Sequence, residues 1–149
     1  MVLVVGYGNS LRSDDGVGIF IANRIAEANL GDVDIRTTQQ LGPELVVDLA
    51  RYDKIIFIDA ASNGDKISVR RLSSEDNCST ASSHHMKPEL LLELAQKIYQ
   101  TRADAYVCTV RGECFEIGEQ ISDSVIKAAE EAFRELRTLI LKEGKYARS

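Results

Sequence analysis

The residues of this sequence best suited to chemistry are two carboxylates and a histidine on three separate segments. Asp15 follows the first predicted strand, Asp59 ends the central predicted strand, and His84 ends a polar loop. In a parallel sheet the carboxyl ends of the strands open onto one crevice, where ligands bind. Two carboxylates and an imidazole gathered there suit a divalent ion such as nickel or zinc. The pattern indicates a metal site, although an aspartate at a strand end is often a turn residue and a loop histidine is often only solvated.

The stretch "GYGNSLRSDDGVG", residues 6–18, admits two other interpretations. A dinucleotide cradle needs the pattern G-x-G-x-x-G, but Leu11 stands where the third glycine belongs. Asp14 and Asp15 would also repel a pyrophosphate at the helix N-terminus. The sequence therefore disfavours a Rossmann-type nucleotide-binding protein. Alternatively, Ser13 and the two acids simply cap the following helix and form its first turn, which would account for Asp14.

Short apolar runs predict the strands that would position these groups, and they alternate with segments of helical period. The predicted strands cover residues 2–5, 33–37, 54–59, 66–72 and 105–110. Arg70 and Arg71 place the fourth of these at an edge of the sheet. We predict a single domain over residues 1–149 of the α/β class. It is a three-layer α/β/α sandwich with a mostly parallel central sheet of about five strands, one edge strand of which can run antiparallel.

Helices are predicted between these strands. Apolar residues at helical spacing predict a helix from Val17 to Ala28, and Pro43 occupies a favoured first position of a short helix. A third helix begins near Pro88, and the final one covers residues 125–140. The inward stripe of the third helix is predicted to be Leu91, Leu94, Ala95 and Ile98.

Composition excludes several classes of protein. A net charge of -5 argues against a nucleic-acid partner. No apolar run approaches the roughly 20 residues that span a bilayer, and the N-terminus lacks the features of a signal peptide, so no membrane association is expected. The cysteines Cys78, Cys108 and Cys114 are odd in number and form no CxxC pair, which favours a reducing, cytoplasmic setting. No G-x-S-x-G elbow occurs, so any hydrolysis would use water as the nucleophile.

Four blocks of the sequence resemble one known family. The blocks "GYGNSLRSDDGVG", "IIFIDAA", "SSHHMKPELLLELA" and "VCTVRGECFEIGEQIS" resemble, in the same order, those of the hydrogenase maturation proteases, the nickel-dependent endopeptidases related to HybD and HycI. The first block, with the pattern G-x-G-N-x-L-x-x-D-[DE]-G-x-G, is highly specific. The similarity extends into the final helix and spans nearly the full chain.

This resemblance implies an endopeptidase that removes a C-terminal peptide from the nickel-loaded large-subunit precursor of a [NiFe] hydrogenase. Asp15, Asp59 and a loop histidine would then contact the metal. We favour His84 over His85 by its offset from the following leucines. The nickel would be supplied by the substrate, with zinc or cadmium as surrogates. Because the three protein ligands form an incomplete shell, the site would bind only a substrate that carries the ion.

The resemblance also suggests the roles of individual residues. Asp15 and Asp59 are the candidate catalytic residues, one of them as general base, and Gly8, Asn9 and Gln39 are the candidate substrate-binding residues. Where many family members carry Asp-Gly after the second strand, residues 37–40 read Thr-Thr-Gln-Gln. This departure leaves a non-catalytic, metal-binding maturation chaperone as the alternative function.

Overall fold

A five-stranded sheet forms the centre of the protein in the computed structural model, which describes residues 1–73 and 86–142. The strands are β1 (Val2–Tyr7), β2 (Val33–Thr38), β3 (Lys54–Ala61), β4 (Ile67–Arg71) and β5 (Asp104–Arg111). They lie in the order β2-β1-β3-β5-β4, and every neighbouring pair is parallel except β4 with β5. The predicted sheet, mostly parallel with an antiparallel edge strand, is thus confirmed.

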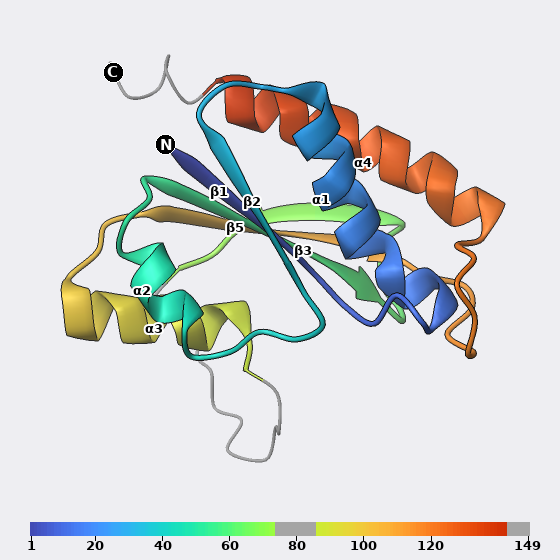
Figure 1. The fold of residues 1–149 in the computed structure, drawn as a ribbon, viewed down its shortest axis with the longest axis horizontal. Coiled ribbons are helices and arrows are strands. Elements are labelled where there is room, and N and C mark those ends of the chain that lie inside the picture. Colours follow the sequence, from blue (N-terminus) through green and yellow to red (C-terminus); the bar gives the residue numbers. More distant parts are fainter. Residues whose placement is uncertain (74–85, 143–149) are drawn as a thin grey trace.

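Helices cover both faces of this sheet. A 3-10 turn, η1 (Ser13–Gly16), leads into α1 (Val17–Ala28), and the other helices are α2 (Leu45–Leu49), α3 (Pro88–Tyr99) and α4 (Asp123–Leu141). Figure 1 shows α1 and α4 on one face and α2 and α3 on the other. The predicted three-layer α/β/α arrangement is confirmed. None of the helices in the described ranges is long and apolar enough to cross a membrane.

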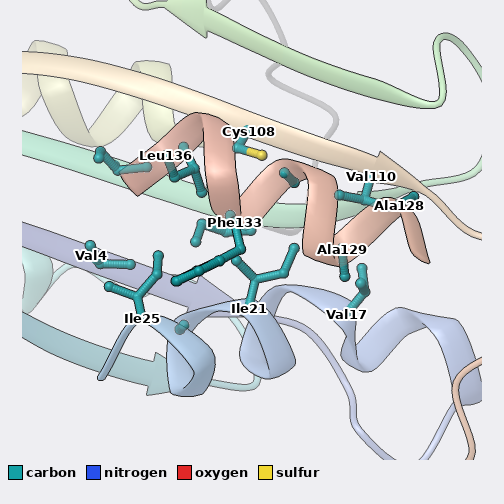
Figure 2. Packing of buried hydrophobic residues seen from close by; sticks show 14 of the residues in the cluster. Val4, Val17, Ile21, Ile25, Cys108, Val110, Ala128, Ala129, Phe133 and Leu136 are labelled. Atoms are coloured by element: carbon teal, nitrogen blue, oxygen red, sulfur yellow. The ribbon is translucent and has the colours of Figure 1, made fainter. Parts of the chain in front are cut away.

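Alternate residues of the central strands supply two apolar cores. In β1, Val2 and Val4 face α1 and α4, whereas Leu3 and Val5 face α2 and α3. Figure 2 shows the first core, where side chains of α1 and α4 pack over the sheet. Because both faces are covered, β1 and β3 read as unbroken apolar runs, and this is why the sequence identifies them clearly.

Two predicted boundaries were wrong. The central strand continues past Asp59 to Ala61, because β3 keeps its pairing with β5 over those last residues. Asp59 therefore lies inside a strand and not in the turn after it. Pro43 lies in a turn before α2, which begins at Leu45.

The inward face of α3 also differs from the predicted stripe. Leu91 and Ala95 are buried and Leu94 packs partly against the core, as expected. Ile98, however, is 62% exposed, and Leu92 is buried in its place. The helix is therefore rotated toward Leu92, and Ile98 in its last turn faces solvent.

A close approach at Gly18 sets the position of α1. A Cβ atom added there would lie 2.8 Å from the Tyr7 carbonyl oxygen and nearer still to that of Ile58. Both are backbone atoms that cannot move aside, so only glycine fits. This contact holds the first turn of α1, and the loop that precedes it, over the carboxyl ends of β1 and β3.

Candidate active site

The loop between β1 and α1 is folded around Asp15. Gly8 begins the loop with a φ of +142°, which L side chains rarely adopt, and its backbone N–H donates to the Thr38 carbonyl at 3.1 Å. The Asn9 backbone N–H donates to Oδ2 of Asp15 at 2.8 Å, and the Asn9 side-chain oxygen accepts from the Leu11 N–H at 2.9 Å. These contacts hold the Asp15 carboxylate at the end of β1, where it is only partly buried.

Asp59 provides the second carboxylate, from β3. Its pKa is raised to about 6, chiefly by burial and also by the negative charge of Asp15, against the lowering effect of the hydrogen bonds from the Ala60 N–H and the Tyr7 hydroxyl. The Ala60 N–H donates to Oδ1 at 2.8 Å. A carboxylate with this pKa ionises close to neutral pH, as a general base must.

The structure thus brings together two of the three predicted metal ligands. The Asp15 charge acts on Asp59, so both carboxylates lie at the same edge of the sheet, although they are 44 positions apart in the sequence. His84 and His85 lie outside the described residues. Within residues 1–73 and 86–142, no group of three His, Cys, Asp or Glu side chains is close enough together to hold a metal ion.

Tyr7 is a site residue that sequence reasoning missed. It ends β1, one residue beyond the last pair with β3, which joins Gly6 to Ile58, and its hydroxyl donates to Asp59. Burial raises the pKa of Tyr7, and the Asp59 charge and hydrogen bond raise it further, so the hydroxyl stays protonated. The available signal was register: in adjacent parallel strands, Tyr7 and Asp59 are the next residues to pair.

Asp14 has a role different from the predicted helix cap. The carboxylate is fully buried, and no side chain caps η1 or α1 through a hydrogen bond. Instead Oδ2 accepts the N–H groups of Glu113 and Cys114 and the Ser122 hydroxyl, each at 2.8 Å, and Oδ1 accepts the Ser122 N–H at 2.7 Å. Burial raises the pKa of Asp14, but these hydrogen bonds outweigh it and hold the pKa below its ordinary value. Asp14 thereby ties the segment between β5 and α4 to the loop that carries Asp15.

The other predicted binding residues lie at the same edge. β2 pairs with β1 as far as Thr38 opposite Tyr7, so Gln39 follows directly at the carboxyl end of β2 and is exposed. Gly8 has no room for a side chain, because a Cβ atom would collide with the Asp15 carbonyl oxygen. A contact of Gly8, Asn9 or Gln39 with a substrate stays a prediction.

A further cavity lies elsewhere in the described residues. It measures about 800 Å³ and is lined by residues at the amino ends of β3 and β5, among them Lys54 and Asp104. Its charged lining is mixed in sign, and the Lys54 ammonium group already donates to the Leu139 carbonyl at 3.1 Å. The carboxylate pair lies at the other, carboxyl edge of the sheet.

No family model and no curated protein sequence matches the chain. Solved structures do. An endopeptidase from Escherichia coli is 24% identical, with a TM-score of 0.76 over 96% of this chain and 93% of that one. The hydrogenase maturating endopeptidase HybD from E. coli is 20% identical, with a TM-score of 0.72 over 96% and 93% of the two chains. The [NiFe] hydrogenase maturation protease HycI from Thermococcus kodakarensis is also 20% identical, with a TM-score of 0.72 over 92% and 90%.

This chain has the hydrogenase maturation protease fold. The likeness covers nearly the full length of each of these chains. In this chain, the maturation protease fold places Asp15 and Asp59 at the carboxyl edge of the sheet, where ligands bind in open α/β folds.

Proposed function

We propose that the chain is a cytoplasmic endopeptidase that removes a C-terminal peptide from the nickel-loaded large-subunit precursor of a [NiFe] hydrogenase. The observation that carries the proposal is the pair of carboxylates, Asp15 and Asp59, within a fold shared with maturation proteases. A fold alone hosts many activities, so the site has to supply the argument.

The protonation states of the site suit hydrolysis by water. With a pKa of about 6, Asp59 is ionised at pH 7 and accepts a proton from an attacking water. The Tyr7 hydroxyl donates to Asp59 and holds the carboxylate in place. Asp15, anchored by the Asn9 N–H, keeps a second negative charge beside it.

The same two carboxylates fit a divalent cation that arrives within the substrate. The negative charges of Asp15 and Asp59 repel each other, and a cation bound between the two carboxylates would relieve that repulsion. Two carboxylates with one imidazole, for which we propose His84, form an incomplete shell that binds a free ion weakly. When bound, such an ion polarises the scissile carbonyl. A precursor without nickel would lack this contact, so the site would distinguish loaded from unloaded substrate. Zinc or cadmium would occupy the metal site as surrogates for nickel.

The test is cleavage of a nickel-loaded and a nickel-free precursor, with the products weighed by mass spectrometry. We expect a C-terminal peptide from the loaded form only. Asp15→Asn and Asp59→Asn should each slow its release by about a hundredfold or more, whereas the exposed Asp65→Asn should not. Binding of the loaded precursor without peptide release would support the chaperone alternative. Full activity in the Asp15→Ala, Asp59→Ala double variant would exclude a catalytic role for both residues.

A further inference from the structure

The segment between β5 and α4 presents an exposed apolar surface beside the candidate site. Ile117 is 93% exposed and Leu11 is 58% exposed. Their backbones are joined: Arg12 and Gly118 form a parallel bridge, and the Gly118 N–H donates to the Leu11 carbonyl at 2.8 Å. Leu11 and Ile117 each precede a bridge residue, so their backbones lie side by side. Large apolar side chains exposed together in this way often mark an interaction site.

This surface is held rigidly next to the catalytic candidates. The Ser13 N–H donates to the Gly118 carbonyl at 2.7 Å, and the Asp14 N–H donates to the Cys114 carbonyl at 2.9 Å. The buried Asp14 carboxylate adds four further hydrogen bonds to the same segment. Asp15 directly follows Asp14 in the chain. A partner bound at Ile117 would therefore lie beside the loop that carries Asp15.

The surroundings of the surface are acidic. Residues 112–123 contain four carboxylates, Glu113, Glu116, Glu119 and Asp123, and neither Lys nor Arg. An open cavity of about 570 Å³ adjoins the bridge, and its lining includes Glu119 and Asp123 together with Ile121. The nearby Arg12 is turned toward the base of the segment, where its Nε donates to the Phe115 carbonyl at 3.2 Å. The cavity therefore suits a positively charged side chain.

We infer that Leu11, Ile117 and the adjoining cavity form a docking surface for the precursor protein, distinct from the carboxylate pair. The surface takes a segment of that protein in which an apolar side chain is flanked by Lys or Arg. The apolar side chain packs on Leu11 and Ile117, and the basic one enters the cavity beside Glu119. This inference rests on the proposed function for the identity of the partner.

The experiment measures the affinity of the full chain for the loaded precursor by biolayer interferometry, alongside peptide release. Ile117→Ser should weaken binding by about tenfold or more, as for a central interface residue. Ile98→Ser is the matched control, because Ile98 is 62% exposed on α3 and lies outside the surface. Glu119→Lys should also weaken binding, and wild-type affinity should fall as salt rises, whereas Glu131→Lys on α4 should change little.

The outcomes separate the two proposals. Unchanged affinity in both Ile117→Ser and Glu119→Lys, with normal cleavage, would overturn the docking surface and leave the protease function standing. Binding that depends on Ile117 without any cleavage would support the surface and contradict the protease function. A wild-type chain that neither binds nor cleaves any cognate precursor would overturn both. Equal thermal midpoints would show that Ile117→Ser, which touches no buried group, acts on binding alone.

Discussion

Replacement of Asp14 by asparagine tests whether this buried carboxylate joins two distant segments. The side chain accepts four hydrogen bonds of 2.7–2.8 Å. An amide of the same shape must turn its NH₂ toward at least one donor. The least costly orientation places the nitrogen against the Ser122 N–H and keeps the oxygen toward the other three donors.

The magnitude follows from these contacts. One N–H left without an acceptor costs about 1–3 kcal/mol, and three hydrogen bonds that lose a charged acceptor each weaken by roughly 1 kcal/mol. We therefore expect Asp14→Asn to lower the free energy of unfolding by about 4–6 kcal/mol. For a domain of this size, that corresponds to a fall of roughly 10–20 °C in the thermal midpoint. Because the pKa of Asp14 is lowered in the folded state, its contribution is present above pH 4 and is lost as the pH falls.

Guanidinium unfolding at pH 7 and at acid pH, followed by circular dichroism, gives both quantities. The difference between wild type and Asp14→Asn should shrink below about pH 4, the ordinary pKa of aspartate. The exposed Asp65→Asn is the control and should change stability little. Hydrogen exchange should quicken at the amides of Glu113, Cys114 and Ser122. A loss below about 1 kcal/mol, well under the cost of unmade hydrogen bonds, would refute the reasoning.

Further predictions concern the site and its support. Asp59→Asn should slow cleavage by about a hundredfold or more yet raise the free energy of unfolding at pH 8 by about 3 kcal/mol, because a pKa raised from 3.8 to about 6 means that the charged form opposes folding. That gain should vanish below about pH 4, where Asp59 is protonated in both states, and an equal gain at pH 3 would contradict it. Tyr7→Phe removes a hydrogen bond that lowers the pKa of Asp59, so the acid limb of the pH profile of kcat/KM should move to higher pH; an unmoved limb would argue against Asp59 as the base. Gly18→Ala should cost about 1–3 kcal/mol in urea unfolding, since its Cβ would meet backbone oxygens. Gly64→Ala is the control, because a Cβ there meets nothing within 4 Å. It tests only the strain of the positive φ and should lower the free energy of unfolding by less.

Much of the fold can be predicted from the sequence because its signals are local. The apolar runs of β1 and β3 and the arginines of β4 indicate a sheet buried at its centre and open at one edge. Boundaries were less predictable. Asp59 was placed at a strand end because it is polar, but pairing between β3 and β5 continues the strand to Ala61. Spacing predicts Ile98 in the core, but α3 is rotated so that Leu92 is buried and Ile98 is exposed.

The site could be predicted only in part, because sequence signals are local and some of its contacts join distant segments. Asp15 and Asp59 come after the apolar runs of β1 and β3, so parallel topology alone suggests that they meet. The role of Asp14 could not be predicted in this way. The N–H groups that donate hydrogen bonds to its carboxylate are about a hundred residues away in the sequence, and the residues around position 14 do not indicate them. Tyr7 required the exact register of two strands, which spacing does not give. His84 lies outside the described residues, and its role as a ligand stays a prediction.

The two carboxylates come from different layers of the sandwich, Asp59 from the central sheet and Asp15 from the turn that leads into the helical layer of α1. Asp15 belongs to the turn that leads into α1, on one face of the sheet, whereas Tyr7 packs with the core under α2 and α3, on the other face. A partly folded chain in which only one layer has docked would carry one half of the site without the other. In the proposed endopeptidase, cleavage would therefore require the complete sandwich, and an incompletely folded copy would not cleave the precursor.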